Sequence, residues 1–293
     1  MHRYLRAIGF SKINTRTDFE KVLGIIMESP TSKHTLSLEH NHRIVQFNKD
    51  FIDNIGISVV GEYDEKGFFY FNYSTPYAIS NRVSSKENVI INKRVDTDAY
   101  TGMCDDMRLG VSLIFYLQNA IQHGINDSSN PVGKLANIYL SALSTEGKIL
   151  LGISNDKSRE KLDMMETKRQ HKLINEAKNG NQEAINILSI DELDLISAIS
   201  RRIKYEDVYS VVNSSFIPYG SESDNYTIIG TILNWELIAN TYTQENIYYL
   251  MINCNNLIFP VYINEADLIG EPMIGRRFKG NIWMQGHVDF DNI

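Results

Sequence analysis

The closing stretch of the chain, residues 262–290, constrains the fold more than any other part. Its sequence is YINEADLIGEPMIGRRFKGNIWMQGHVDF, with glycines at positions 270, 275, 280 and 286, at intervals of five, five and six residues. A proline, three basic residues and one of only two tryptophans stand among them. Glycines at such density are typical of turns, bulges and close backbone contacts rather than of a helix. We therefore interpret this stretch as the closing part of a small β-domain.

The composition is that of an ordinary globular protein. The chain has 293 residues, of which 43% are hydrophobic and 22% charged, and this length is sufficient for two domains. No apolar run approaches the ~18 residues that span a bilayer, and no apolar core follows the basic N-terminus as a signal peptide would require. Cys104 and Cys254 are two lone thiols far apart, which suit a reducing compartment. We expect a cytoplasmic protein without a membrane partner.

A helix is predicted near the start, and strands follow it. Thr17-Asp18-Phe19-Glu20 has the form of a capping box, apolar residues recur behind it at helical spacing, and Pro30 ends the segment. Between Ile44 and Val95 apolar and polar residues alternate. This alternation predicts a meander of three to five strands.

The middle of the chain mixes helical and extended patterns. Asp105 or Asp106 can cap a longer helix, which Gly124 would end. Residues 138–153 predict a hairpin around a turn near their centre. Charged segments with helical spacing, between residues 157 and 203, then predict a helical connector.

The last third returns to an alternation of period two. Gly230 inside one apolar run is typical of a bulge, and Asn255-Asn256 is compatible with a hairpin turn. About five strands in under 90 residues suggest a small OB-like barrel, with a small sandwich as the alternative. The strands are expected at residues 208–216, 226–235, 246–253, 257–263 and 277–288.

The predicted fold class is therefore α+β, in three parts. Residues 1–155 form an α+β domain, residues 156–205 a helical connector, and residues 206–293 a small acidic all-β domain. The last part holds three Lys and Arg residues against eleven Asp and Glu, a net charge of −8 in a chain whose total is −7. Such a surface repels phosphate backbones and attracts basic partners or cations.

One basic cluster lies within this acidic segment. Arg276, Arg277, Phe278 and Lys279 precede Trp283, and cations interleaved with aromatic rings are the means by which OB-type folds bind single-stranded nucleic acid. Three cations against eleven carboxylates favour a different role, in which the cations neutralise the domain's own charge and Trp283 belongs to the core. Because nucleic-acid-binding modules are typically basic, we expect nucleic acid to be the weaker hypothesis.

The histidines gather at His34, His40 and His42. His40 and His42 would lie on one face of a strand and could both reach a metal, yet no cysteine or nearby aspartate completes a familiar ligand spacing. A solvated loop is the favoured interpretation, with a metal-dependent enzyme as the alternative. Cys104 has no histidine near it in sequence to act as a base, so we expect it to be packed. We therefore predict no cofactor and no catalytic residue.

Three stretches together carry a resemblance to a known family. They are MHRYLRAIGFSKI at the start, SAISRRIKYEDVYSVV with FIPYGSESDNY in the middle, and DLIGEPMIGRRFKGNIWMQGHVDF at the end. The chain resembles, over essentially its whole length, the bacterial family known as domain of unknown function 3881. The resemblance implies a cytosolic bacterial protein and transfers no activity, cofactor or site residue.

The functional hypothesis follows from charge and from the motifs that the sequence lacks. It contains no GxGxxG, Walker, GxSxG or HExxH motif. We predict a non-catalytic binding or regulatory module that acts through a protein partner, for which a basic protein is one candidate, or through self-association. Single-stranded nucleic-acid binding and a metal-dependent enzyme are the alternatives.

Overall fold

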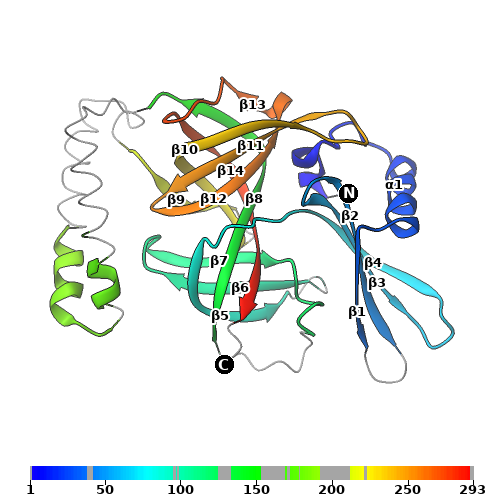
Figure 1. The fold of residues 1–293 in the computed structure, drawn as a ribbon, viewed down its shortest axis with the longest axis horizontal. Helices are drawn as coiled ribbons and strands as arrows, with labels where there is room; N and C mark the ends of the chain where they lie inside the picture. The colour runs from blue at the N-terminus through cyan, green and yellow to red at the C-terminus, as the bar shows by residue number, and fades with distance from the viewer. Residues whose placement is uncertain are drawn as a thin grey trace.

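Strands form more than half of the residues that the computed structural model describes. The model describes residues 2–37, 42–94, 97, 99–124, 133–152, 169, 172–177, 179–191, 212–220 and 223–290. Within these residues the strands fall into a four-stranded and a ten-stranded sheet, which Figure 1 shows beside each other.

The smaller sheet is an antiparallel meander covered by one helix. Its strand order follows the chain, and apolar residues of helix α1 (Arg16–Glu28) pack against β2 and β3. The predicted helix is confirmed. The meander predicted between Ile44 and Val95 is confirmed up to Ala78, whereas its last strand, at residues 85–93, belongs to the larger sheet. The N-cap of α1 is Thr15, two residues before the expected Thr17, and the Thr15 side chain accepts a hydrogen bond from Asp18 N at 3.1 Å. The strands are β1 (Ser32–Ser37), β2 (Arg43–Ile52), β3 (Ile55–Tyr63) and β4 (Phe69–Ala78).

The larger sheet takes strands from both halves of the chain. Its order is β11-β12-β8-β5-β6-β7-β14-β10-β9, with β13 beside β8 and with further pairings β10–β11 and β8–β14. Two short 3₁₀ helices, η1 (Arg3–Ile8) and η3 (Glu265–Asp267), adjoin it. The strands are β5 (Ser85–Lys93), β6 (Tyr100–Asp106), β7 (Val111–Leu117), β8 (Lys134–Leu150), β9 (Ser215–Pro218), β10 (Asn225–Ala239), β11 (Asn246–Cys254), β12 (Leu257–Asn264), β13 (Leu268–Ile269) and β14 (Arg277–Phe290).

The pairings close two rings of strands that share the long antiparallel pair β8–β14. One ring runs through β8, β12, β11, β10 and β14. The other runs through β8, β5, β6, β7 and β14. Each long strand gives one half to each ring, and Figure 1 shows green β8 and the red end of β14 side by side between them. One continuous set of buried apolar side chains fills both rings.

Glycines in the shared strands leave room for one buried phenylalanine in each ring. Gly147 and Gly280 stand opposite each other in the β8–β14 register, and a Cβ atom on Gly147 would lie 2.4 Å from the Phe278 ring. In the other ring a Cβ atom on Gly286 would lie 2.8 Å from the Phe115 ring. Real Cβ atoms do not approach so closely, so the glycine spacing of the closing stretch reflects packing inside the rings.

The predicted α+β class is wrong, because the architecture is mostly β without being all-β. The segment expected as a helix up to Gly124 is instead the β6–β7 hairpin. Val111, Leu113 and Phe115 also alternate with a period of two, and Leu113 and Phe115 are fully buried on one face. The hairpin expected within residues 138–153 is a single strand, β8, that passes straight through Gly147.

The predicted C-terminal OB-like barrel or sandwich does not match the observed sheet. Its strands 226–235, 246–253, 257–263 and 277–288 are confirmed as β10, β11, β12 and β14. However, β12 and β14 both pair with β8, which ends at Leu150, more than 50 residues before the expected start at 206. A ring of strands cannot be closed without β8, so these strands belong to the common sheet.

The helical connector lies largely outside the described residues. Within it, residues 172–177 and 182–191 are helical. The boundaries 1–155, 156–205 and 206–293 therefore stay a prediction. None of the helices in the described ranges is both long enough and apolar enough to cross a membrane.

Candidate functional site

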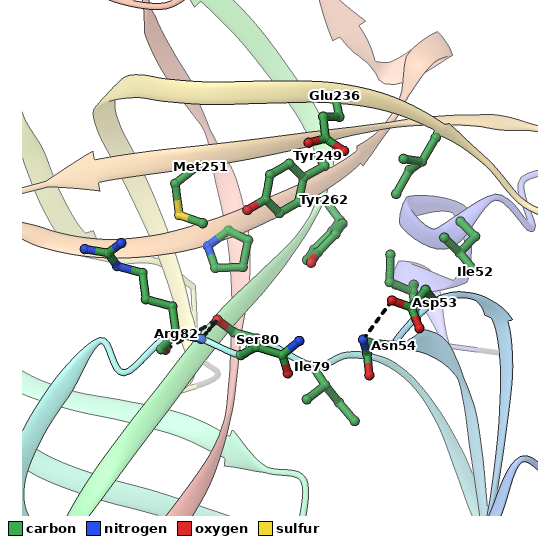
Figure 2. Close-up of a pocket in the computed structure, with 14 residues that line it drawn as sticks. Ile52, Asp53, Asn54, Ile79, Ser80, Arg82, Glu236, Tyr249, Met251 and Tyr262 are labelled. Carbon is green, nitrogen blue, oxygen red and sulfur yellow. Dashed lines mark hydrogen bonds between the residues drawn. The ribbon is translucent and has the colours of Figure 1, made fainter.

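A groove of about 480 Å³ lies where the two sheets meet. One wall is the outer face of β10, β11 and β12, and the other combines the β2–β3 turn with the connection from β4 to β5. Figure 2 shows side chains from both walls directed into this space, which we call the intersheet groove. It is open to solvent along one side.

The strand register builds the first wall as a row of polar and aromatic side chains. Glu236 on β10 stands opposite Tyr249 on β11, and Tyr249 stands opposite Tyr262 on β12. The two tyrosine rings lie with centroids 5.5 Å apart. Met251 and Pro260 form the next row on the same face, since side chains repeat every second residue along a strand. The wall therefore has an acidic end, an aromatic centre and an apolar flank.

Two short turns supply the second wall and are held by local hydrogen bonds. In the β2–β3 turn Asn54 adopts a left-handed backbone with φ of 60°, and its side chain donates to Asp53 Oδ2 at 3.1 Å. Ile79 N donates to the Asn54 carbonyl oxygen at 2.8 Å and so ties the two turns together. Arg82 N donates to Ser80 Oγ at 3.2 Å. Both turns are thus ordered before any ligand arrives.

Two carboxylates, Asp53 and Glu236, and one guanidinium, Arg82, line the groove. Burial raises the pKa of Tyr262, and the neighbouring Tyr249, Asp53 and Glu236 raise it further. Burial and Glu236 also raise the pKa of Tyr249, against an opposite effect of Arg82. Both hydroxyls therefore stay protonated at neutral pH. Two carboxylates beside the faces of neutral tyrosine rings are the surroundings that a cationic group prefers.

Carboxylates, one guanidinium, tyrosine hydroxyls and apolar side chains line the groove. None of its fourteen lining residues is a histidine or a cysteine, so it offers no pairing of a nucleophile with an imidazole base. What it offers is a mixed surface of carboxylates, tyrosine hydroxyls and apolar side chains. Such a surface orients a ligand through a few polar contacts while the apolar flank provides contact area.

The structure does not bring the basic cluster predicted from sequence together on one exposed surface. Phe278 is fully buried inside a ring, and the buried Arg277 donates to the carbonyl oxygens of Leu151 at 2.9 Å and Val212 at 2.6 Å. Arg276 and Lys279 are partly exposed, and Arg276 Nη1 donates to the Glu271 carbonyl oxygen at 2.8 Å. The cluster holds loops against the sheet.

Trp283 lies at a buried junction between the two sheets. Its indole Nε1 donates to Asp224 Oδ2 at 2.9 Å, and the same oxygen accepts from Arg94 Nη1 at 3.0 Å. The rings of Tyr4 and Tyr116 lie with centroids 5.4 and 5.2 Å from the indole. Trp283 is 4% exposed, so its ring is packed on its faces and is not displayed for a base to stack on it.

The histidine group is only partly described. His34 lies on β1 opposite Gln46, and His42 lies just before β2. Their register separates them along the β1–β2 pair by four residues, on the order of 13 Å. His40 lies outside the described residues. Across the described ranges, no three His, Cys, Asp or Glu side chains gather as metal ligands.

Cys104 lies on β6 instead of ahead of a helix. It is buried, and burial together with Asp106 raises the pKa of its thiol to about 12. The thiol is therefore protonated at neutral pH, and the prediction that Cys104 is packed is confirmed.

A family model covers nearly the whole chain. Residues 5–286 match the family described as "Domain of unknown function, E. rectale Gene description (DUF3881)". The chain belongs to this family. The resemblance inferred from the three stretches is thereby confirmed. Searches of the curated proteins and of the solved structures gave no significant match. Membership in the DUF3881 family brings no described activity, so the groove has to be interpreted from its own residues.

Sequence reasoning missed the groove because its residues come from five separate segments. One signal was present. Glu236 is the only charged residue between Asn225 and Ala239, a strand that is otherwise apolar or neutral. A lone carboxylate in such a strand predicts an exposed or functional position. The tyrosines that face it became visible only through the register of β10, β11 and β12.

Proposed function

We propose that this protein is a non-catalytic binding module whose intersheet groove takes an extended segment of a protein partner that carries a basic side chain. The observation that carries the proposal is the row Glu236–Tyr249–Tyr262 facing Asp53 across the groove. A lysine or arginine side chain entering there meets aromatic faces and two carboxylates.

The shape of the groove supports a polypeptide ligand over a small molecule. Sites for small ligands bury most of the ligand's surface, whereas this groove is open along one side. Extended segments bind along such open surfaces, with individual side chains in shallow depressions. The excess of carboxylates in residues 206–293 adds a long-range attraction for a basic partner. A cytoplasmic location, which the two buried thiols support, is part of the proposal.

The test measures binding of a fluorescent hexapeptide of alternating arginine and alanine to the full chain. The same peptide with glutamate in place of arginine controls for charge. We expect saturable binding of the arginine peptide, and a double variant Asp53→Asn/Glu236→Gln should raise its Kd at least roughly ten-fold, because it weakens two charge-assisted contacts.

A matched variant separates the groove from bulk charge. Glu28→Gln/Glu65→Gln removes two exposed carboxylates at the end of α1 and in the β3–β4 turn, outside the groove lining. We expect it to leave the Kd within about two-fold at physiological salt, where distant surface charges are screened. An equal loss of affinity in both double variants, or no binding by the wild-type protein, contradicts the proposal.

A further inference from the structure

One edge of β10 is left without a strand beside it over half of its length. β14 pairs with β10 as far as Thr231, and Ile232 still exchanges backbone hydrogen bonds with Gly275 and Arg276. From Leu233 to Ala239, β11 on the other edge is the only strand among the described residues that pairs with β10. A free edge presents a row of backbone donors and acceptors to other chains.

This edge has only part of the usual protection against pairing, namely the charge of Glu236 and a shift of register between Ile232 and Asn234. Residues 233–239 read LNWELIA and contain neither lysine nor proline. Leu233, Trp235 and Leu237 are 39%, 38% and 45% exposed. Trp235 touches Tyr248 in an edge-to-face contact with centroids 6.0 Å apart, so the indole is held in place at the edge. A rigid, exposed tryptophan beside two exposed leucines is costly in a monomer.

The sequence of the edge is self-complementary about Trp235. An antiparallel pairing of two copies centred on Trp235 places Leu233 of one copy opposite Leu237 of the other. It also places Asn234 opposite Glu236, so that each amide meets a carboxylate. Leu-Asn-Trp-Glu-Leu thus matches itself at all five positions. Cross-strand pairs of this kind are the unit of sheet stabilisation.

The neighbouring registers fit less well. A pairing centred on Glu236 sets two like charges directly opposite each other, which is destabilising. A pairing centred on Asn234 sets Glu236 against Ile232, whose backbone groups already bond Gly275 and Arg276. The exposed Met273 and Ile274 adjoin this end of the edge and extend its apolar surface.

We infer that β10 is the interface of a two-fold symmetric homodimer, in which two copies of this chain join through antiparallel pairing of residues 233–237 about Trp235. The interface is isologous, since the same patch on both copies forms it. This inference goes beyond the binding proposal and rests on the strand edge, although Glu236 belongs both to the groove wall and to the proposed pairing.

Sedimentation velocity of the full chain tests the inference. We expect a dimer at tens of micromolar, and Trp235→Glu should give a monomer with an unchanged circular dichroism spectrum, because it sets two carboxylates opposite each other at the axis. Phe68→Glu, at a more exposed aromatic residue before β4, should remain a dimer. A monomeric wild type at several hundred micromolar, a dimeric Trp235→Glu, or an open-ended series of larger species overturns the inference.

A pair of charge variants keeps the test independent of any folding defect at Trp235. In the proposed register Asn234→Lys brings an ammonium group opposite Glu236 of the other copy and should tighten the dimer. Because the dimer contains this Lys–Glu pair twice, the dissociation constant should fall about two- to thirty-fold. Asn234→Glu should loosen the dimer by a similar factor, and raised salt should shrink both effects. If both variants change the dissociation constant of the dimer in the same direction and to the same extent, the proposed register is wrong.

Discussion

Gly280 is a residue whose role depends on a side chain two positions away. Its missing Cβ would lie 2.5 Å from the Phe278 ring and 2.7 Å from the Glu146 carbonyl oxygen. The ring fills the space that Gly280 and the facing Gly147 leave on the inner side of the β8–β14 pair. Glycine is thus required here for packing, and its backbone is ordinary strand.

Gly280→Ala should destabilise the fold by about 1–3 kcal/mol, because the Phe278 ring and the strand must move apart in a tightly packed core. Gly24→Ala is the matched control. Gly24 lies inside α1 with nothing within 4 Å of its missing Cβ, so alanine there should be neutral or stabilise by up to about 1 kcal/mol. Urea unfolding of both variants measures the difference, and equal effects would contradict the packing role.

His287 should make stability depend on pH. Its ring stacks on Tyr139 at 4.4 Å, and burial lowers the pKa of the imidazole to about 4. The unfolded chain takes up a proton near pH 6.5, whereas the folded chain takes it up near pH 4. The free energy of unfolding should therefore fall as pH drops from about 6.5 to about 4, by up to roughly 3 kcal/mol.

His287→Phe isolates this contribution from the other titrating groups. The ring and its stacking on Tyr139 are kept, but the ionisable nitrogen is lost. Chemical denaturation at pH 7.5 and at pH 4.5 should show a smaller loss of stability in the variant than in the wild type. Identical pH dependence in the two proteins would contradict a neutral buried imidazole.

At the level of elements, an ion pair closes the β6–β7 turn. Arg108 Nε donates to Asp106 Oδ1 at 2.8 Å, and its other nitrogens bond Ser85 Oγ at 2.9 Å and the Asn256 carbonyl oxygen at 3.1 Å. Burial alone would raise the pKa of Asp106, but the hydrogen bonds from Arg108 and Ser85 outweigh it and hold that pKa below its usual range. One arginine thus joins β5, β6 and the β11–β12 turn.

Arg108→Met should cost about 3–5 kcal/mol, because it leaves the Asp106 carboxylate buried without its cation. Arg16→Met removes an exposed pair with Glu20 on α1 and should cost less than about 0.5 kcal/mol. Thermal and urea unfolding of the two variants provide the comparison. A small effect of Arg108→Met would mean that solvent reaches Asp106 readily.

Local sequence patterns predicted the elements whose structure is decided locally. α1 has its cap and helical spacing, and β10 to β12 have alternation and the Asn255–Asn256 turn, in which both residues have positive φ. The patterns failed at β8, because Gly147 resembles a turn residue in sequence. Glycine is required there because a Cβ atom would meet the Phe278 ring, and Phe278 lies more than 130 residues away in the chain. The groove could not be predicted for the same reason, as only strand register brings its residues together.

At the scale of the whole molecule, β8 and β14 make the two rings depend on each other. Each ring is closed by one half of both strands, and one apolar core runs through both. Loss of one ring therefore exposes the shared strands of the other. Unfolding should be a single transition that coincides by circular dichroism and by tryptophan fluorescence. Two resolved transitions would instead support a boundary near residue 205.

The most direct test of the proposed binding role is hydrogen exchange of the full chain with and without the arginine–alanine hexapeptide. The proposal predicts slower exchange confined to residues 52–55, 79–82, 236–238, 249–251 and 260–262, the segments that line both walls of the groove. Slower exchange around residues 276–283 instead, or no change in the groove segments at saturating peptide, would contradict it.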